Sequence, residues 1–573
     1  MNAVREQARK KRKFLPPDLS ITGWTDVEPY AFQLRDARLS SPDELKLWLA
    51  RRSELDAVIA EDKAWLYIRQ SCHTDNEEYA RTFAAFVQDV EEPYSLLSNE
   101  LNKKLLAYCK NHPYPKEYEI FIRNIRRQTE IFREENVKLL SELEVEEQQY
   151  GSITGAMTIS YDGKELTLQQ AQNYLKSTDR MIRQKVFELI LHRRSTDYEK
   201  LDDLYTSLLA KRQRIAENAG FTNYLEYRFA QLGRFDYTIA DCENFHQAVE
   251  TQVVPLLDRI ASIRKEKLGL TTLLPYDLEV DTDGKEPLRP FETPGELISK
   301  SIACYEAIDP QFGEFIRIMD KNAFLDLDSR KGKAPGGYNY PLHESNIPFI
   351  FMNATHNLRD LETMMHEGGH AIHSFLSSDL EFVYYKETPA EIAEVASMAI
   401  ELISMEHWHY FFDNEDDLKR ARLSQLEGVL KVLPWVATID KFQHWVYTHP
   451  GHSANKRVSA WRSIEGSLSS QLIDWGPYPE YRDRMWQKQI HLFQFPLYYI
   501  EYGIAQLGAI GIWKNYKEDP ARTIQAYKHA LSLGYSKTLP ELYEAAGIRF
   551  DFSAGYINSL CDFVRNELEG LSK

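Results

Sequence analysis

Residues 364–373 read Met364-Met365-His366-Glu367-Gly368-Gly369-His370-Ala371-Ile372-His373. Two histidines four residues apart lie one above the other on one face of a helix, so His366 and His370 can approach the same ion. Their ring nitrogens can hold zinc at about 2.0–2.1 Å. Glu367 follows the first histidine, where its carboxylate can reach a water held by the metal. The pattern is His-Glu-x-x-His. It predicts a helix that binds one zinc ion per chain and uses Glu367 as general base.

Gly368 and Gly369 stand between the two histidines. Glycine costs about 1 kcal/mol relative to alanine in the interior of a helix. A helix with a purely structural role would therefore gain from alanine at these positions. We infer that another segment of backbone, or a substrate, passes close to this helix.

A zinc site that hydrolyses peptides needs a third protein ligand and an open fourth position. The metzincin pattern would require histidine at position 376, where the chain has Leu376. The spacing of thermolysin-like peptidases would require glutamate near 389 or 390, which are Pro389 and Ala390. The next segment has no lysine or arginine from 387 to 406 and carries three carboxylates on one helical face, Glu387, Glu391 and Glu394. The third ligand is expected among them.

Apolar residues recur with helical spacing along most of the chain. The segments 40–148 and 168–191 are amphipathic, and the chain after residue 358 reads as helical almost to its end. Strand patterns are confined to a hairpin at 157–166 and a strand at 348–353. We predict a mainly α-helical fold with a small β-sheet beside the metal helix.

The size and charge of the chain exclude some classes of protein. Its 573 residues exceed what one compact core usually organises, so two lobes or several subdomains are expected. The formal net charge is −17, which argues against a nucleic-acid partner because such binding needs a basic surface. The longest apolar stretch, residues 504–513, is too short to cross a bilayer, so no membrane partner is expected.

The cysteines and the N-terminus bear on location. Five cysteines are scattered without a Cys-x-x-Cys pair, so neither a disulfide framework nor a thiolate zinc site is expected, and a cytoplasmic location is predicted. The basic run at 9–13 is not followed by the apolar segment of a signal peptide. We expect a solvated, flexible arm over residues 1–18.

The metal helix resembles the His-Glu-x-Gly-His helix of the thimet oligopeptidase and oligoendopeptidase F family of zinc peptidases, with Gly369 at the family glycine. The likeness is closest to the oligoendopeptidase F branch. Residues 387–397 resemble the family's E-x-P-x-E-I-A-E-V-A-S segment, which implies that Glu394 is the third zinc ligand. Residues 331–338 resemble its glycine-rich loop near the cleft, and residues 348–353 resemble its edge strand beside bound peptide.

Residues 491–502 resemble the family segment in which a histidine and tyrosines face the zinc from the opposite wall. The oxyanion of the transition state needs a hydrogen-bond donor, and we expect Tyr502 or Tyr499, helped by His491, to supply it. Tyr502 is the preferred donor because its spacing from Tyr499 is about one helical turn. The likeness extends over about residues 150 to 565.

The resemblance also implies an architecture and an activity. The fold would be a mostly helical, two-lobed ellipsoid with a deep central channel. An N-terminal helical lobe, residues 1–189, would roof the channel, and residues 190–573 would form the zinc-metallopeptidase catalytic domain. The partners would be short unstructured peptides, cut at internal bonds by a zinc oligoendopeptidase. The oligomeric state is not indicated by the sequence.

Two other functions remain open from the residues alone. A zinc dipeptidyl carboxypeptidase would use the same metal chemistry to remove C-terminal dipeptides. A peptide-binding homologue without catalysis would be expected to lack Glu367 or a ligand, and this chain lacks neither. Glu391 would either orient a zinc-bound histidine or be solvated. His373, one turn beyond His370, is expected to be structural or to face the substrate.

Overall fold

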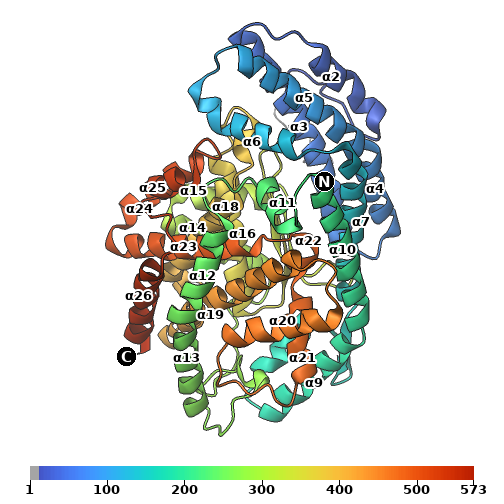
Figure 1. The fold of residues 1–573 in the computed structure, drawn as a ribbon. Helices are drawn as coiled ribbons and strands as arrows, with labels where there is room; N and C mark the ends of the chain where they lie inside the picture. Colours follow the sequence, from blue (N-terminus) through green and yellow to red (C-terminus); the bar gives the residue numbers. More distant parts are fainter. Residues whose placement is uncertain (1–11, 573) are drawn as a thin grey trace.

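α-Helices form most of the molecule (Figure 1). The computed structural model describes residues 12–572, and the chain is 70% helix and 4% strand. The prediction of a mainly α-helical fold with small sheets is therefore confirmed. The N-terminal part of the chain forms helices α2 (Trp24–Asp36), α3 (Pro42–Cys72), α4 (Glu77–Phe86), α5 (Glu92–Asn111), α6 (Glu119–Ile131) and α7 (Glu134–Gly155).

The rest of the chain continues this helical pattern and adds five short strands. The helices of the middle part are α8 (Leu168–Gln172), α9 (Arg180–Ser195), α10 (Tyr198–Asn218), α11 (Tyr224–Gln231), α12 (Ile239–Gln252), α13 (Val254–Lys267), α14 (Pro294–Ile308) and α15 (Pro310–Lys321). The later helices are α16 (Leu358–Leu376), α17 (Val383–Lys386), α18 (Ala390–Ser404), α19 (Glu415–Thr448), α20 (Ala454–Ser467), α21 (Pro479–Asp483), α22 (Ile490–Gln494), α23 (Tyr499–Glu518), α24 (Pro520–Ser532), α25 (Leu539–Ala545) and α26 (Ala554–Ser572). The strands are β1 (Thr158–Tyr161), β2 (Lys164–Thr167), β3 (Leu325–Asp328), β4 (Tyr338–Tyr340) and β5 (Phe349–Ala354).

Buried apolar side chains form two clusters. One lies among the N-terminal helices, which cap the molecule at the top of Figure 1, and includes Leu49 of α3 and Phe382 from just before α17. The other fills the remaining body and includes Trp65 and Ile68 from the second half of α3. Helix α3 therefore contributes to both clusters. The predicted domain boundary between residues 189 and 190 stays a prediction.

The start of the described chain packs against the protein instead of extending into solvent. Leu15 is 3% exposed and belongs to the N-terminal cluster. Arg12 forms an ion pair with Glu344, and both side chains are buried. Within the arm expected over residues 1–18, the side chains of Arg12 and Leu15 are therefore packed, whereas Lys13, Pro17 and Asp18 are exposed, and the arm as a whole stays a prediction. The remainder of the arm, residues 1–11 with the first three residues of the basic run, lies outside the described residues.

The first sheet is the predicted hairpin. β1 pairs antiparallel with β2, with Thr158 opposite Thr167. Asp162 and Gly163 form the turn with positive φ angles of 51° and 70°. Aspartate and glycine are the residues that tolerate this left-handed backbone in two-residue hairpin turns. The hairpin expected at 157–166 is confirmed.

The second sheet has the strand order β3-β5-β4. β3 is parallel to β5, and β4 is antiparallel to it. β5 confirms the strand expected at 348–353, but it is the central strand and has a partner on each side. The prediction that it is the edge strand is therefore wrong. Its nearly continuous run of buried apolar residues is typical of a central strand, and Tyr338–Tyr340 forms the edge.

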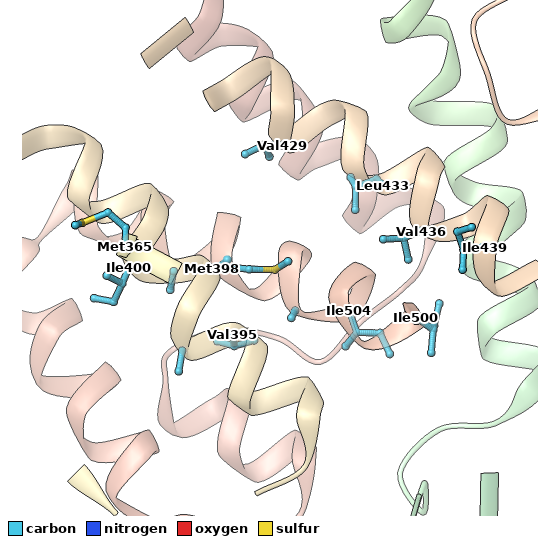
Figure 2. Packing of buried hydrophobic residues seen from close by; sticks show 14 of the residues in the cluster. Met365, Val395, Met398, Ile400, Val429, Leu433, Val436, Ile439, Ile500 and Ile504 are labelled. Carbon is cyan, nitrogen blue, oxygen red and sulfur yellow. The ribbon is translucent and has the colours of Figure 1, made fainter. Parts of the chain in front are cut away.

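Helices α16, α18, α19 and α23 form the packed centre of the molecule. Figure 2 shows Val395 and Met398 of α18, Ile504 of α23 and Val436 of α19 in this part of the core. A Cβ on Gly508 of α23 would lie 2.8 Å from the Cγ2 of Val395. Glycine at this position thus allows α18 and α23 to approach closely. This packing sets the spacing of the helices that carry the functional side chains.

No helix among the residues that the structure describes is both long and apolar enough to cross a membrane. The five cysteines are all free thiols, and each of them except Cys109 is buried. The buried thiols contribute to packing as small apolar groups.

Candidate metal and catalytic site

Helix α16 carries the His-Glu-x-x-His pattern, and its start is capped by its own side chains. Asn357 accepts a hydrogen bond from the backbone N–H of Arg359 at 2.8 Å, and Asp360 accepts one from the backbone N–H of Asn357 at 2.9 Å. This reciprocal cap satisfies N–H groups that lack partners at a helix start. His366 and His370 follow within the helix, with ring centroids 4.8 Å apart.

Gly368 and Gly369 allow two neighbours to approach α16. A Cβ on Gly369 would lie 2.5 Å from the Cα of Ser397 on α18. A Cβ on Gly368 would lie 2.0 Å from the hydroxyl oxygen of Tyr305 on α14. That hydroxyl is 2.9 Å from each of two carbonyl oxygens in the preceding turn of α16. The inference that another segment passes close to this glycine pair is confirmed.

Helices α16 and α18 bring three side chains of metal-ligand type together. The Oε2 of Glu394 lies 3.3 Å from the Nε2 of His366 and 3.6 Å from the Nε2 of His370. All three ligand-type atoms lie within 4.8 Å of one another. The side chain of Glu394 is 3% exposed, whereas each histidine side chain keeps 19% of its surface exposed. Two imidazoles and one carboxylate form the donor set of a catalytic zinc site with an open position, so these residues fit such an ion.

Glu401 orients His366, although the sequence patterns did not single it out. Its Oε1 accepts a hydrogen bond from the Nδ1 of His366 at 2.6 Å, and its Oε2 accepts one from the Nε2 of Gln425 at 3.1 Å. The Nδ1 of His366 therefore carries a proton that is hydrogen-bonded to Glu401, and its Nε2 faces the candidate metal position. The sequence did contain an indication of this carboxylate, because Glu401 follows Glu394 by seven residues, about two helical turns, and so lies on the same helical face.

Glu391 lies apart from the three ligand-type residues. Its Oε1 accepts a hydrogen bond from the hydroxyl of Tyr237 at 2.6 Å, and its carbonyl oxygen accepts one from Tyr543 at 3.3 Å. The orienting role considered for Glu391 is filled by Glu401. The solvated alternative does not hold either, because Glu391 is 3% exposed. Glu391 is a buried hydrogen-bond acceptor between helices.

Burial and charge act in opposite directions on the pKa values at this site. Burial raises the pKa of Glu367, and the imidazoles of His366 and His370 offset this effect in part. Burial also favours the neutral form of Glu394, but the same two imidazoles hold its pKa below the usual value. Glu394 is thus kept ionised as a ligand should be, whereas Glu367 has a raised proton affinity.

Strand β4 runs beside Glu367. The Nδ2 of Asn339 donates to the carbonyl oxygen of Glu367 at 3.4 Å. A Cβ on Gly337, the residue before the strand, would lie 3.6 Å from the Oε1 of Glu367 and 3.2 Å from the Cγ2 of Thr363. A Cβ at position 337 would therefore crowd Thr363 and be in van der Waals contact with the carboxylate of Glu367. The edge of the sheet that lies next to Glu367 is β4.

The glycine-rich loop that leads into β4 is held from two sides. The carbonyl oxygen of Gly332 accepts a hydrogen bond from the N–H of Thr74, and the N–H of Ala334 donates to the carbonyl oxygen of Ser71, both at 2.7 Å. Lys333 is buried and donates to carbonyl oxygens of β3 and β5. The loop therefore links the end of α3 to the sheet beside Glu367.

Two tyrosines at the start of α23 face the ligand group. Tyr498 donates a hydrogen bond to the Oε1 of Glu394 at 2.6 Å. The hydroxyl oxygen of Tyr502 lies 3.1 Å from the Nε2 of His491. Burial and then the charge of Glu394 raise the pKa of Tyr502. Tyr498 therefore contacts Glu394 directly, and the rings of Tyr502 and His491 lie next to Tyr498, at centroid distances of 5.3 and 5.9 Å.

Tyr499 faces another partner. Its hydroxyl donates to the Oε1 of Gln489 at 3.2 Å. Burial is the main cause that raises its pKa to about 12, and no carboxylate of the metal group contributes. The structure directs this hydroxyl at Gln489, unlike the hydroxyl of Tyr502. The choice of Tyr502 over Tyr499 as oxyanion donor stays a prediction.

His373 is buried, and burial lowers its pKa to about 3, so its ring is neutral. Its Nε2 has no hydrogen-bond partner within residues 12–572. Of the two roles expected for His373, the structural one fits this burial.

A second group of ligand-type atoms, from Cys242, Asp440 and His444, lies between α12 and α19. All three residues are buried, and the Oδ2 of Asp440 lies 2.8 Å from the Nε2 of His246. A peptide cannot reach a group with no solvent-exposed side. This buried cluster therefore does not compete with the site on α16 as a catalytic centre.

Comparison with known proteins gives consistent matches. The model of the family described as Peptidase family M3 matches residues 173–561. An oligoendopeptidase F homologue of Borreliella burgdorferi is 25% identical over 489 residues, which are 82% of this chain and 80% of that protein. A crystal structure described as an oligoendopeptidase F has a TM-score of 0.89 at 26% identity and is covered over 98% of each chain. PZ peptidase A, solved with an inhibitor, has a TM-score of 0.89 at 27% identity, with 95% of this chain and 96% of that chain covered.

Proposed function

Because the chain belongs to peptidase family M3 and is a metalloendopeptidase, we propose that it is a zinc-dependent oligoendopeptidase that hydrolyses internal bonds of short, unstructured peptides. In this proposal His366, His370 and Glu394 hold the ion, and Glu367 is the general base. The observation that carries it is the convergence of two imidazole nitrogens and one carboxylate oxygen within 4.8 Å, beside a glutamate whose pKa is raised by burial.

A bound Zn²⁺ polarises a substrate carbonyl and lowers the pKa of a water molecule towards about 7. The residues of the chain supply the other parts of the reaction. Glu367 takes the proton of the attacking water and passes it to the leaving amine, and its raised proton affinity suits both transfers. Tyr502 donates its hydroxyl hydrogen to the carbonyl oxygen as negative charge develops there. Tyr498 holds the Oε1 of Glu394, so that Oε2 stays turned to the histidines.

Strand β4 supports peptides as the substrate class. An extended peptide can add to the edge of a sheet through main-chain hydrogen bonds, with modest demands on its sequence. β4 is an edge strand, and Gly337 and Asn339 lie next to Glu367. A peptide paired along β4 would run past the general base. A folded domain does not offer such an extended segment, which favours short unstructured substrates.

The proposal includes a location and a domain arrangement. The free thiols favour a reducing compartment, for which the cytoplasm is the natural candidate. The division into an N-terminal lobe, residues 1–189, and a catalytic domain, residues 190–573, stays part of the proposal, as does a channel between them.

The test combines metal analysis by mass spectrometry with cleavage of an internally quenched peptide whose C-terminus is amidated. We expect one zinc ion per chain and cleavage at an internal bond. Loss of dipeptides from free C-termini, with the amidated peptide left intact, would indicate a dipeptidyl carboxypeptidase instead. Binding without cleavage by zinc-loaded protein would indicate a peptide-binding homologue.

Two variants locate the measured ion. His370→Ala should lose zinc and activity together, because one of three ligands is removed. Cys242→Ser is the matched control, since it alters the buried Cys242, Asp440 and His444 cluster and leaves α16 and α18 untouched. Zinc lost from Cys242→Ser and retained by His370→Ala would contradict the assignment of the metal to α16.

A further inference from the structure

We propose that Gln489, held in place by Trp435, is a positioning residue that keeps the proton of His491 on Nε2 and thereby leaves the hydroxyl hydrogen of Tyr502 free for the substrate. This inference rests on the proposed function, because it takes Tyr502 as the donor to the oxyanion. The evidence for it is which groups can donate and accept along a row of four hydrogen-bonded side chains, Trp435, Gln489, His491 and Tyr502.

The side-chain amide of Gln489 has one orientation that satisfies its neighbours. Its Oε1 accepts hydrogen bonds from the indole N–H of Trp435 and from the hydroxyl of Tyr499, both at 3.2 Å. An indole N–H can only donate. If the amide were turned over, its NH₂ group would face the indole N–H, and two donors would oppose each other at 3.2 Å. The carbonyl oxygen of Gln489 must therefore point to Trp435.

This orientation directs the NH₂ group of Gln489 at His491. The Nε2 of Gln489 lies 2.7 Å from the Nδ1 of His491. Since an amide nitrogen donates, Nδ1 must accept and carries no proton. Burial lowers the pKa of His491 to about 4, so the ring is neutral at pH 7. A neutral imidazole without a proton on Nδ1 carries it on Nε2.

The position of this proton decides what Tyr502 can do. The Nε2 of His491 lies 3.1 Å from the hydroxyl oxygen of Tyr502. With the proton on Nε2, His491 donates and the oxygen of Tyr502 accepts, so the hydroxyl hydrogen can go to a substrate oxygen. In the opposite tautomer, Nε2 would accept a hydrogen bond from the hydroxyl of Tyr502. That hydroxyl hydrogen would then not be available to the substrate.

The surroundings hold this arrangement, and the effect of burial on the pKa of His491 outweighs that of the charge of Glu394. Gln489 immediately precedes α22, and its backbone N–H donates to the carbonyl oxygen of Trp486 at 3.0 Å. The ionisable side chains that face His491 are tyrosines of α23 and, at longer range, one carboxylate of α18: Tyr498, Tyr499, Tyr502 and Glu394. Burial raises the pKa of each of these tyrosines, so all three are neutral at pH 7.

The substitution Gln489→Glu reverses the direction of the hydrogen bond between residue 489 and the Nδ1 of His491. A carboxylate only accepts, so it keeps Trp435 as its donor but requires the Nδ1 of His491 to donate. The carboxylate also raises the pKa of His491. Below that pKa both ring nitrogens carry protons and Tyr502 remains free. Above that pKa, the ring carries its proton on Nδ1 alone, and its Nε2 accepts a hydrogen bond from the hydroxyl of Tyr502.

The expected kinetic result is therefore a loss of kcat at alkaline pH that the wild type does not show. Relative to wild type, kcat of Gln489→Glu should fall by about 10²–10³-fold at high pH, the worth of one oxyanion donor, and recover as the pH falls. KM should change little. Gln489→Met, which removes the hydrogen bonds but adds no charge, should show a smaller loss without this pH dependence. A loss of equal size at every pH for Gln489→Glu would overturn the proposal.

A double-mutant cycle shows whether the effect passes through His491. In a His491→Phe background, Gln489→Glu should cause no further alkaline loss, because the ring that carries the effect is absent. The same loss in both backgrounds would mean that Gln489 acts in another way, and the proposal would fail.

Nuclear magnetic resonance of ¹⁵N-labelled histidine reads the tautomer without turnover. The signals of His491 are identified by their disappearance in His491→Phe. We expect a proton on Nε2 alone in the wild type at pH 7, and a proton on Nδ1 in Gln489→Glu. A wild-type ring protonated on Nδ1 alone would overturn the proposal. The expected tautomer in a protein that cleaves no peptide would support the positioning role and contradict the proposed function alone.

Discussion

Replacing Gly369 by alanine should disturb the metal site through the backbone of α18. The added Cβ would lie 2.5 Å from the Cα of Ser397 and 2.9 Å from the carbonyl oxygen of Ala396. Carbon atoms in contact normally lie about 3.5–4.0 Å apart, so α16 and α18 must separate by about 1 Å. Because these neighbours are backbone atoms, no side-chain rotation can relieve the contact.

The separation acts on both stability and metal binding. Overpacking costs about 1–3 kcal/mol, and alanine recovers about 1 kcal/mol over glycine within a helix, so the free energy of unfolding should fall by up to about 2 kcal/mol. Glu394 lies three residues before Ser397 and moves with α18 away from the histidines of α16. A displacement of about 1 Å at a reacting centre costs on the order of 10²-fold in rate, and we expect a fall of about that size in kcat, with weaker zinc binding.

Chelator competition measures zinc affinity in this variant, and calorimetry of the metal-free protein measures stability. Gly428→Ala is the matched control. Gly428 lies within α19, and nothing lies within 4 Å of a Cβ built there, so alanine should be neutral or stabilise the protein by up to about 1 kcal/mol. Wild-type zinc affinity and kcat in Gly369→Ala would refute the reasoning that this glycine sets the spacing between α16 and α18.

Three further outcomes are expected. Glu401→Gln should lower zinc affinity by about 10–100-fold, because the group that orients His366 loses its charge; an unchanged affinity in zinc titration would exclude that role. Tyr502→Phe should lower kcat by about 10²–10³-fold with little change in KM; if Tyr499→Phe shows this loss in steady-state kinetics and Tyr502→Phe does not, the two assignments must be exchanged. One scissile sequence should be cut as a free peptide and spared inside a stably folded carrier, and comparable cleavage of both would contradict a substrate that must enter extended.

The metal helix could be predicted because its geometry is local. The spacing of His366 and His370 places both rings on one helical face wherever the helix lies in the fold. The glycine pair also indicated a close neighbour, since two glycines weaken a helix. The identity of that neighbour, the backbone of α18 at Ser397, depends on tertiary packing, which local spacing does not specify.

The order of the second sheet could not be predicted in the same way. The strand at 348–353 was visible as an apolar run, but β4 is three residues long and follows a glycine-rich loop, so it carries no readable alternation. The family resemblance implied an edge position for residues 348–353, and no sequence pattern for β4 contradicted it. The burial of Arg12 was hidden for a similar reason, because its partner Glu344 lies 332 residues away in the sequence.

Glu401 shows where a sequence signal existed and was not used. It continues the acidic face of α18 two turns beyond Glu394, but acidic helical faces are common on protein surfaces. Only the placement of α18 against α16 shows that this carboxylate meets the Nδ1 of His366. The convergence of His366, His370 and Glu394 could thus be predicted from spacing and family resemblance, whereas the contact between Glu401 and His366 required the fold.

Glu367→Gln, with zinc content and turnover measured on the same preparation, tests the central claim most directly. The substitution keeps the size of the side chain and leaves His366, His370 and Glu394 in place, so zinc should remain at the wild-type level. The amide cannot accept the proton of the attacking water, and kcat should fall by at least about 10²–10⁴-fold. Near-normal turnover at full zinc content would contradict the claim that Glu367 is the general base of a zinc peptidase.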